Sequence, residues 1–168
     1  MNLILCGMMG AGKTTVGIKI AKKSGRRWYD TDEVIAQKYG KITDIFAKKG
    51  EPYFRDLETK TVKKLSANDN LVISVGGGLV LREENVAILK QSGIIVYLRA
   101  TKQTLLYRLR EDSTRPLLQG ENLADKLDGL LSTRAPIYEK AADYIVCVDK
   151  KTPDEIADEI LGIMAKKY

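Results

Sequence analysis

Short apolar runs rich in β-branched residues alternate along the whole chain with longer segments in which apolar residues recur every three or four positions. The short runs predict five strands, which cover residues 3–6, 27–30, 71–75, 94–98 and 144–148. The longer segments predict helices, which cover roughly residues 13–23, 32–39, 43–49, 51–67, 83–91, 101–111, 123–140 and 152–166. This alternation is typical of a three-layer α/β/α fold, in which helices cover both faces of a five-stranded parallel sheet.

The last predicted helix has the clearest start. Thr152 is placed to act as its N-cap, Pro153 occupies the first turn, and Glu155 completes a capping box. Isoleucines at helical spacing follow, so this segment should pack one face against the sheet.

A chain of 168 residues supports one domain with a substantial core and is short for two, so we expect a single domain over residues 1–168. No run approaches the roughly 20 apolar residues of a membrane span. The N-terminal residues lead directly into a strand, without a basic region followed by an apolar stretch and a cleavage site. We therefore expect a cytoplasmic protein that binds no membrane.

Histidine is absent from the chain, which excludes Ser-His and Cys-His nucleophile pairs and imidazole metal ligands. Cys6 and Cys147 each lie in an apolar run, and we expect both to be buried thiols. The net charge of +6 comes from lysines and arginines scattered over predicted helix faces and ends, without interleaved aromatic residues. This distribution is typical of a solvated surface, so we expect no nucleic-acid partner.

Residues 7–14 read Gly-Met-Met-Gly-Ala-Gly-Lys-Thr and follow the first apolar run directly. Glycines at Gly7 and Gly12 let successive backbone N–H groups turn toward phosphate oxygens. Lys13 can reach the β- and γ-phosphates, Thr14 can offer a hydroxyl to Mg²⁺, and the helix that follows adds the positive end of its dipole. The segment therefore predicts a nucleotide phosphate site.

Two carboxylates follow the second predicted strand, at Asp30 and Asp32. Because ligands of such sheets bind beyond the carboxyl ends of the strands, both side chains can face the phosphate site. One carboxylate can organise the water shell of Mg²⁺, and the other can accept a proton from a hydroxyl that receives the phosphoryl group. The alternative is that Asp32 only caps the following helix.

Three consecutive glycines, residues 76–78, follow the third predicted strand. A plain turn needs one or two glycines, so three of them favour a loop whose backbone closely approaches another group, most simply a substrate. Arg55 and Arg134 could each clamp a carboxylate through two parallel hydrogen bonds, with Glu58 orienting Arg55 from the next helical turn.

An irregular segment between two predicted helices, residues 111–122, has the place and composition of a mobile lid. Arg115 within it could fold over the phosphates and neutralise charge during transfer. Arg108, one helical turn earlier, could lie along a nucleotide base.

These motifs together resemble the shikimate kinase family over nearly the whole chain. The resemblance rests on Gly7 to Gly17, Asp30-Thr31-Asp32, Ile45-Phe46, Gly50-Glu51, Phe54-Arg55, Glu58, Gly76-Gly77-Gly78, Arg115-Pro116-Leu117-Leu118 and Arg134-x-Pro136-x-Tyr138, in that order. The phosphate loop alone is shared by very many proteins, whereas the combination is highly specific.

The resemblance implies transfer of the γ-phosphoryl group of ATP to the 3-hydroxyl of shikimate, a step of aromatic amino acid synthesis, with ADP as the other product and one Mg²⁺ ion as cofactor. It also implies a P-loop kinase fold with strand order 2-3-1-4-5, a shikimate-binding helical region at about residues 31–60, and a monomer. In that order the strands that hold Cys6 and Cys147 are not neighbours, which argues further against a disulfide.

The resemblance further implies that one set of residues contacts shikimate. The set is Asp32, Phe46, Phe54, Arg55, Gly77, Gly78 and Arg134. Asp32 would hold substrate hydroxyls and serve as the candidate base, while Arg55 and Arg134 would clamp the carboxylate. The two glycines would line the pocket, and the two phenylalanines would form its apolar wall.

A second set, implied in the same way, contacts the nucleotide. It is Gly10, Ala11, Gly12, Lys13, Thr14, Thr15, Arg108, Arg115, Lys151 and Pro153. Lys13 and Arg115 would stabilise the transferring phosphoryl group. Thr14 would bind Mg²⁺, and Asp30 would reach the ion through water.

Three alternatives stay open on the sequence alone. Another small-molecule kinase of the same fold, acting on gluconate or a nucleoside monophosphate, would share the phosphate loop. A nucleotide-dependent switch would also share it, although a GTPase would need an Asn-Lys-x-Asp motif and residues 122–125 read Asn-Leu-Ala-Asp. A nucleic-acid-binding ATPase is favoured only by the positive net charge.

Overall fold

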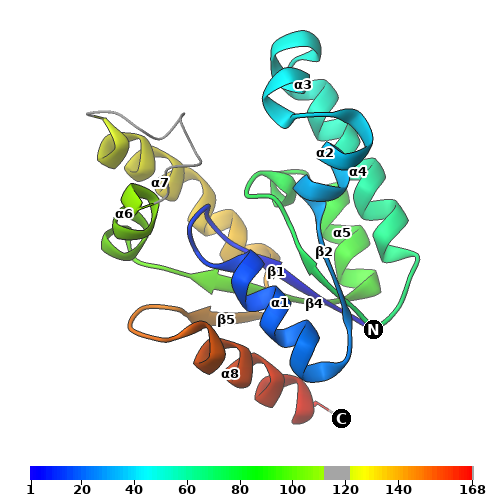
Figure 1. Ribbon diagram of the computed structural model, residues 1–168, viewed down its shortest axis with the longest axis vertical. Coiled ribbons are helices and arrows are strands. Elements are labelled where there is room, and N and C mark those ends of the chain that lie inside the picture. The colour runs from blue at the N-terminus through cyan, green and yellow to red at the C-terminus, as the bar shows by residue number, and fades with distance from the viewer. Residues whose placement is uncertain (112–121, 168) are drawn as a thin grey trace.

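The computed structural model describes residues 1–111 and 122–167, and these contain one five-stranded sheet (Figure 1). Its strands are β1 (Asn2–Cys6), β2 (Arg27–Asp30), β3 (Leu71–Ser74), β4 (Gly93–Arg99) and β5 (Tyr144–Cys147). All pairings are parallel, and the strands lie in the order β2-β3-β1-β4-β5. The predicted α/β class is confirmed, as is the strand order that the family resemblance implied.

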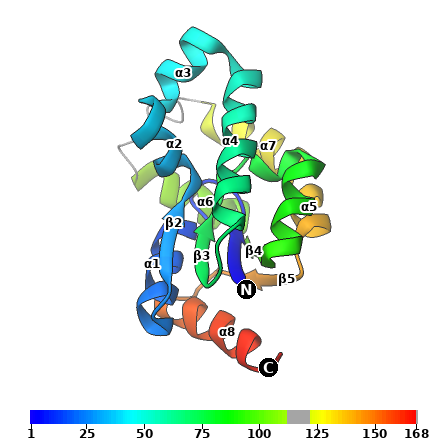
Figure 2. The ribbon, with the colours of Figure 1, turned by 90° about the vertical axis from the view of Figure 1, so that its right-hand side faces the viewer.

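Helices cover both faces of the sheet (Figures 1 and 2). They are α1 (Lys13–Ser24), α2 (Thr31–Tyr39), α3 (Ile42–Lys49), α4 (Glu51–Ser66), α5 (Glu83–Ser92), α6 (Lys102–Glu111), α7 (Leu123–Ala141) and α8 (Pro153–Ala165), together with the short 3-10 helix η1 (Leu79–Leu81). Helices α1 and α8 pack together on one face, whereas α5 and α7 pack against β4 on the other.

The central strand β1 lies at the middle of the main hydrophobic core. All five of its residues are buried, because helices cover it on both faces and β3 and β4 flank it on both sides. The predicted capping box of α8 is also present, since the Thr152 side chain accepts from the Glu155 amide and the Glu155 carboxylate accepts from the Thr152 amide at 2.7 Å. Ile156 and Ile160 of α8 are fully or almost fully buried in this core.

Helices α2, α3 and α4 enclose a second, smaller hydrophobic cluster made of Ile35, Ile45, Phe54 and Leu57. Figure 2 shows α2 and α3 beyond the ends of the strands, above the sheet. Because these helices have their own hydrophobic cluster, they can form one wall of a cleft without packing into the main core.

Both cysteines are free thiols. Cys6 is buried as predicted, and burial raises the pKa of its thiol to about 12, so it stays protonated. Cys147 is only half-buried, because it lies on the edge strand β5, and its thiol contacts the Asp149 carboxylate at 3.1 Å.

Candidate active site

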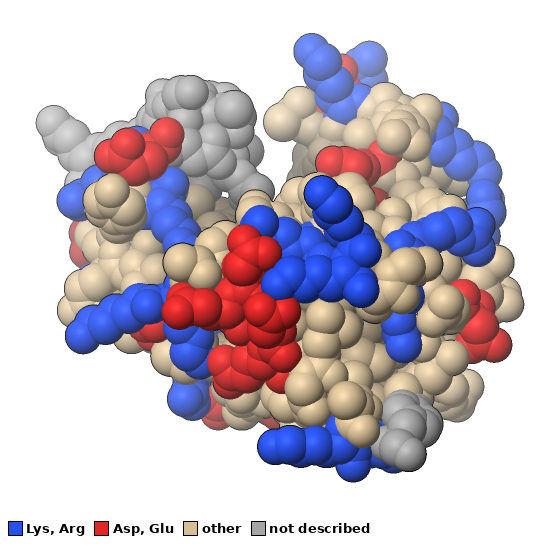
Figure 3. All heavy atoms as spheres, turned by 60° about the horizontal axis from the view of Figure 1, so that its bottom comes forward, with Lys and Arg blue, Asp and Glu red and all other residues tan. Residues whose placement is uncertain are grey.

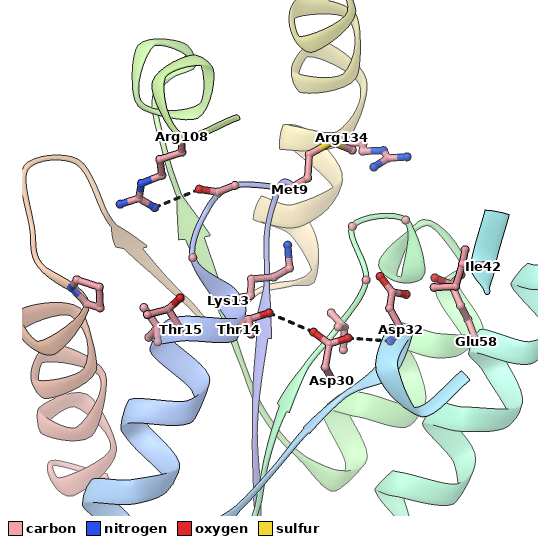
Figure 4. A pocket seen from close by; sticks show the side chains of 18 of the residues that line it. Met9, Lys13, Thr14, Thr15, Asp30, Asp32, Ile42, Glu58, Arg108 and Arg134 are labelled. Carbon is pink, nitrogen blue, oxygen red and sulfur yellow. Dashed lines mark hydrogen bonds between the residues drawn. The ribbon is translucent and has the colours of Figure 1, made fainter. Parts of the chain in front are cut away.

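A cleft of about 680 Å³ opens at the carboxyl ends of the strands, between the helical region α2–α4 and the loop that follows β1 (Figure 4). Its lining residues come from segments far apart in sequence: the loop after β1, the start of α2, the glycine loop after β3, α6, α7 and the start of α8. Parallel strands bring these segments together, because their carboxyl ends all meet at one edge of the sheet. The cleft therefore has the position expected for a ligand site.

The loop between β1 and α1 has the conformation of a phosphate-binding loop. Gly12, at the N-cap of α1, has a φ of 96°, a left-handed value that favours glycine over residues with a Cβ. The Lys13 ammonium donates to the carbonyls of Gly7 at 2.7 Å and Met8 at 3.0 Å, so its charge lies across the loop. The first amides of α1 and the positive end of its dipole face the same place.

Asp30 at the end of β2 performs two tasks. One carboxylate oxygen accepts from the amides of Asp32 at 2.9 Å and Glu33 at 3.2 Å, which makes Asp30 the N-cap of α2. The other oxygen accepts from the Thr14 hydroxyl at 3.3 Å. The alternative that Asp32 caps this helix is therefore wrong, because Asp30 fills that role and Asp32 lies inside the first turn, lining the cleft.

The three glycines after β3 each make room for a side chain that lines the cleft. A Cβ at Gly76 would lie 2.7 Å from a carboxylate oxygen of Asp32, and one at Gly77 would lie 3.2 Å from the guanidinium of Arg134. A Cβ at Gly78 would lie 2.5 Å from Nη2 of Arg55. None of these three described glycines has a positive φ. The close approach that the sequence predicted is observed, but the groups approached are side chains of the protein, so contact of this loop with a substrate stays a prediction.

Arg55 is held at the cleft by two glutamates of its own helix. Its guanidinium donates to the Glu58 carboxylate at 2.8 Å and to the Glu51 carboxylate at 3.1 Å. The predicted orientation of Arg55 by Glu58 is thus observed, with Glu51 as a further partner. The Arg55 side chain is 15 % exposed and that of Glu58 is 1 % exposed, so this ion pair is largely shielded from water.

We expect Gly78→Ala to raise the KM for the acceptor substrate at least tenfold, because the new methyl group would displace the Arg55 guanidinium from its present position. Steady-state kinetics with the acceptor varied would measure this. Gly162→Ala is the matched control, since a Cβ there meets no atom within 4 Å and alanine favours the α8 helix. Equal KM values for the two variants would contradict this account of the glycine loop.

Burial raises the pKa of the Glu58 carboxyl from 4.5 to about 7, against the opposing effect of Arg55 and with a smaller contribution from the charge of Asp32. Between these two values the folded protein keeps a proton on Glu58 that the unfolded chain has released. Stability should therefore fall as the pH rises from 4.5 to 7 and become level above that window.

In the wild type, this fall amounts to at most about 3 kcal/mol of the free energy of unfolding, and we expect Glu58→Gln to abolish it. Urea unfolding of both proteins between pH 5 and pH 8 would measure the difference. Glu51→Gln is the control, because it removes the other carboxylate beside Arg55, which is 61 % exposed. Parallel profiles for wild type and Glu58→Gln would refute the assignment.

The nucleotide side of the cleft is built from α6 and the loop before α8. Arg108 donates to the Gly10 carbonyl at 3.1 Å and, like Pro153 and Thr15, lines the cleft. Lys151 is directed elsewhere, to the Glu159 carboxylate at 2.6 Å, and does not line the cleft.

Asp149 ties this loop to the start of α6. Its carboxylate accepts from the Thr101 amide at 3.0 Å and from the hydroxyls of Thr101 and Thr104 at 3.0 and 2.5 Å. These hydrogen bonds and that of the Cys147 thiol lower the pKa of the Asp149 carboxyl against the effect of desolvation, which is the largest single influence. The sequence analysis did not single out Asp149, although its place directly after a strand was a usable signal.

The remaining expected residues differ in position. Phe54 lines the cleft, whereas Phe46 is exposed, does not line the cleft, and packs against the Phe54 ring with centroids 4.8 Å apart. Ala11 is buried within the phosphate loop, and its amide donates to the Met8 carbonyl at 3.1 Å. Arg115, together with most of the expected lid, lies outside the described residues. Five apolar lining residues were not among the predicted contacts, namely Met9, Val16, Ile42, Val75 and Ile156.

The strand order, the phosphate loop with its lysine, and a cleft lined by three carboxylates and three arginines define a P-loop kinase. A family model described as shikimate kinase matches residues 9–165. The chain belongs to the shikimate kinase family.

Known relatives agree with this assignment. The shikimate kinase of Thermodesulfovibrio yellowstonii is 44% identical over 161 residues, covering 95% of this chain and 92% of the relative. The solved structure of a shikimate kinase from Acinetobacter baumannii in complex with shikimate has a TM-score of 0.92 and 40% identity, covering 99% of this chain and 93% of that one. A deoxyadenosine kinase from M. mycoides, at 17% identity and a TM-score of 0.64, shares the fold alone, covering 98% of this chain and all of that one.

Proposed function

We propose that this protein transfers the γ-phosphoryl group of ATP to the 3-hydroxyl of shikimate, giving shikimate 3-phosphate and ADP in aromatic amino acid synthesis. The observation that carries the proposal is the convergence, in one cleft, of a phosphate-binding loop with a carboxylate and two arginines opposite it. A relative of 40% identity was solved in complex with shikimate, and its fold covers nearly the whole of this chain.

The acceptor would bind between the glycine loop and helices α2, α4 and α7. Arg55 and Arg134 supply fixed guanidinium groups for its carboxylate, and the buried Glu58 holds Arg55 in place. Gly77 and Gly78 admit these arginines to the wall, and Phe54, backed by Phe46, offers an apolar surface to the ring. A six-membered carbon ring with one carboxylate and several hydroxyls fits such a site.

In the transfer step the bond between the γ-phosphorus and the bridging oxygen of ADP breaks, and a bond to the acceptor oxygen forms. Asp32 would orient the acceptor hydroxyl and take its proton as transfer proceeds, since its carboxylate lies in the cleft and not at the helix cap. Lys13 would balance the negative charge that moves onto the phosphate oxygens, and Arg115 would add to it from the lid. The loop amides from Gly10 to Thr15 would hold the phosphates.

The kinase class uses a divalent cation with its nucleotide, and we propose Mg²⁺ here. The Thr14 hydroxyl and the Asp30 carboxylate lie 3.3 Å apart at the cleft, and hard oxygen donors of this kind suit Mg²⁺. Within residues 1–111 and 122–167, no group of three carboxylates or thiols could hold a metal ion alone. An ion bound through few protein ligands, with phosphate oxygens and water completing its shell, fits this donor set, and it would shield phosphate charge.

The base of ATP would lie between Arg108 and the loop that carries Lys151 and Pro153. Arg108 is fixed against the phosphate loop, and Asp149 holds the opposite loop through three hydrogen bonds to Thr101 and Thr104. The Lys151 side chain is paired with Glu159, so Lys151 would contact the base through its backbone, or through its side chain after leaving Glu159.

We further propose a cytoplasmic monomer that binds neither membranes nor nucleic acid. No helix in the described part of the chain has the length and apolar character for crossing a bilayer. On the face shown in Figure 3, a group of acidic side chains lies directly beside basic ones. Surface ion pairs also occur between α1 and α8, such as that of Lys23 with Asp158 at 2.6 Å. Paired charges of this kind do not form the continuous basic surface that a nucleic acid needs.

The test is shikimate-dependent release of ADP with Mg²⁺-ATP, run beside gluconate, AMP and CMP as acceptors. We expect rapid release with shikimate and only background hydrolysis with the others. Rapid release with gluconate or a nucleotide instead would show that this compound, and not shikimate, is the substrate. The assignment of the protein to the kinases would still stand. Background hydrolysis with all four, in a protein shown to be folded, would overturn the proposed function.

A further inference from the structure

Tyr138, on α7, is a completely buried side chain at the back of the cleft wall. Its hydroxyl donates to the Gly77 carbonyl at 2.6 Å, and its ring packs at a tilt against Tyr97 with centroids 5.2 Å apart. Burial raises the pKa of Tyr138 to about 12, so the phenol keeps the proton it donates. Tyr138 itself does not line the cleft.

Three functional segments meet at this hydroxyl. Gly77 belongs to the glycine loop, and Met8 of the phosphate loop lies with its sulfur 3.8 Å from the phenol oxygen. Arg134 stands one helical turn before Tyr138, and its positive charge lowers the pKa of the phenol against the larger effect of burial. A Cβ at Gly77 would lie 3.2 Å from that guanidinium and 3.5 Å from the phenol oxygen, so both side chains border the space beside the Gly77 backbone.

We propose that Tyr138 is a positioning residue for acceptor binding, whose hydroxyl fixes the Gly77 peptide and the Arg134 guanidinium in the cleft wall. A phenol can donate one hydrogen bond and accept another, so a single oxygen sets both neighbours. Without it the Gly77 carbonyl loses its buried donor and the guanidinium loses a neighbouring dipole. The inference rests on the proposed function, because it assigns Arg134 to the acceptor carboxylate.

The test compares Tyr138→Phe with Tyr97→Phe, which removes a hydroxyl from the other ring of the same aromatic pair. We expect Tyr138→Phe to raise the KM for shikimate about tenfold, with the KM for ATP changed less than twofold. Tyr97→Phe should leave both KM values within twofold of wild type. Equal effects of the two variants on all kinetic constants would reduce Tyr138 to a packing role and overturn the proposal.

A double-mutant cycle with Arg134→Ala separates positioning from packing. If Tyr138 acts through Arg134, then Tyr138→Phe should change the KM for shikimate less than twofold once Arg134 is gone. A full tenfold effect in both backgrounds would overturn the proposal. If Tyr138→Phe does not fold, Gly77→Ala replaces it in the cycle, since its methyl group would push the same groups apart and should give the same non-additive result.

The two proposals fail in different ways. Absence of shikimate-dependent ADP release by the wild type removes the proposed function. A wild type that turns over shikimate, with an unchanged KM in a folded Tyr138→Phe variant, removes only the role of Tyr138.

Discussion

Lys13→Ala should lower kcat about a thousandfold. The Lys13 ammonium already lies across the phosphate loop, donating to the carbonyls of Gly7 and Met8. At this place a fixed positive charge offsets the charge that develops on the phosphate oxygens during transfer, in a site partly shielded from water. Single-turnover and steady-state rates of shikimate-dependent ADP release would measure the loss.

Lys19→Ala is the control for that variant. Lys19 lies in the same helix, but its ammonium pairs at the surface with Asp154 at 2.7 Å, so its loss should leave kcat unchanged. Because Lys13 also donates two hydrogen bonds to its own loop, the thermal midpoint of Lys13→Ala must be measured alongside the rates. A kcat within tenfold of wild type would exclude Lys13 as a main source of phosphoryl stabilisation.

Asp32→Asn should lower kcat by two to four orders of magnitude, roughly the range in which proton transfer by a positioned side chain contributes. The amide keeps the size of the carboxylate, so it should still fit beside Gly76, where a Cβ would lie 2.7 Å from Oδ1. It cannot take the proton of the acceptor hydroxyl. ADP affinity should stay within a few-fold of wild type, because the nucleotide would bind on the other side of the cleft.

The matched control is Glu33→Gln, which removes the adjacent carboxylate on the exposed side of α2. Isothermal titration with ADP and a burst-phase measurement of transfer would separate binding from chemistry. Turnover near the wild-type rate in Asp32→Asn would show that phosphoryl transfer here needs no base, as a loose transition state would allow. A parallel loss in Glu33→Gln would point to damage of α2 as a whole.

The sequence predicted the sheet, the phosphate loop and the helix starts well, because each depends on a local pattern. Buried strands and helices are predicted directly from the spacing of apolar residues along the chain. The capping box of α8 involves only Thr152 and Glu155, three residues apart, so its chemistry is visible without any fold. Motif order also sufficed to indicate the family, which the relatives then confirmed.

The sequence predicted less well which residues from distant segments contact each other. The sequence left open whether Asp32 faces the phosphate site or only caps α2, and it did not predict that Asp30 is the cap. Phe46 and Lys151 were expected to contact substrates, but neither side chain lines the cleft. Asp149 ties the loop before α8 to the start of α6. Its place after a strand was a usable signal, but its partners Thr101 and Thr104 could not be identified because they lie more than forty residues away.

By itself, the sequence determined the α/β alternation, the phosphate-binding loop and the presence of three glycines that must approach something closely. Only the tertiary structure decided what they approach: Asp32 at Gly76, Arg134 with Tyr138 at Gly77, and Arg55 at Gly78. The physical reason is the strand register. Pairing of Asp30 with Ser74 in parallel sets the end of β2 beside the glycine loop, and no local property of either segment specifies that pairing.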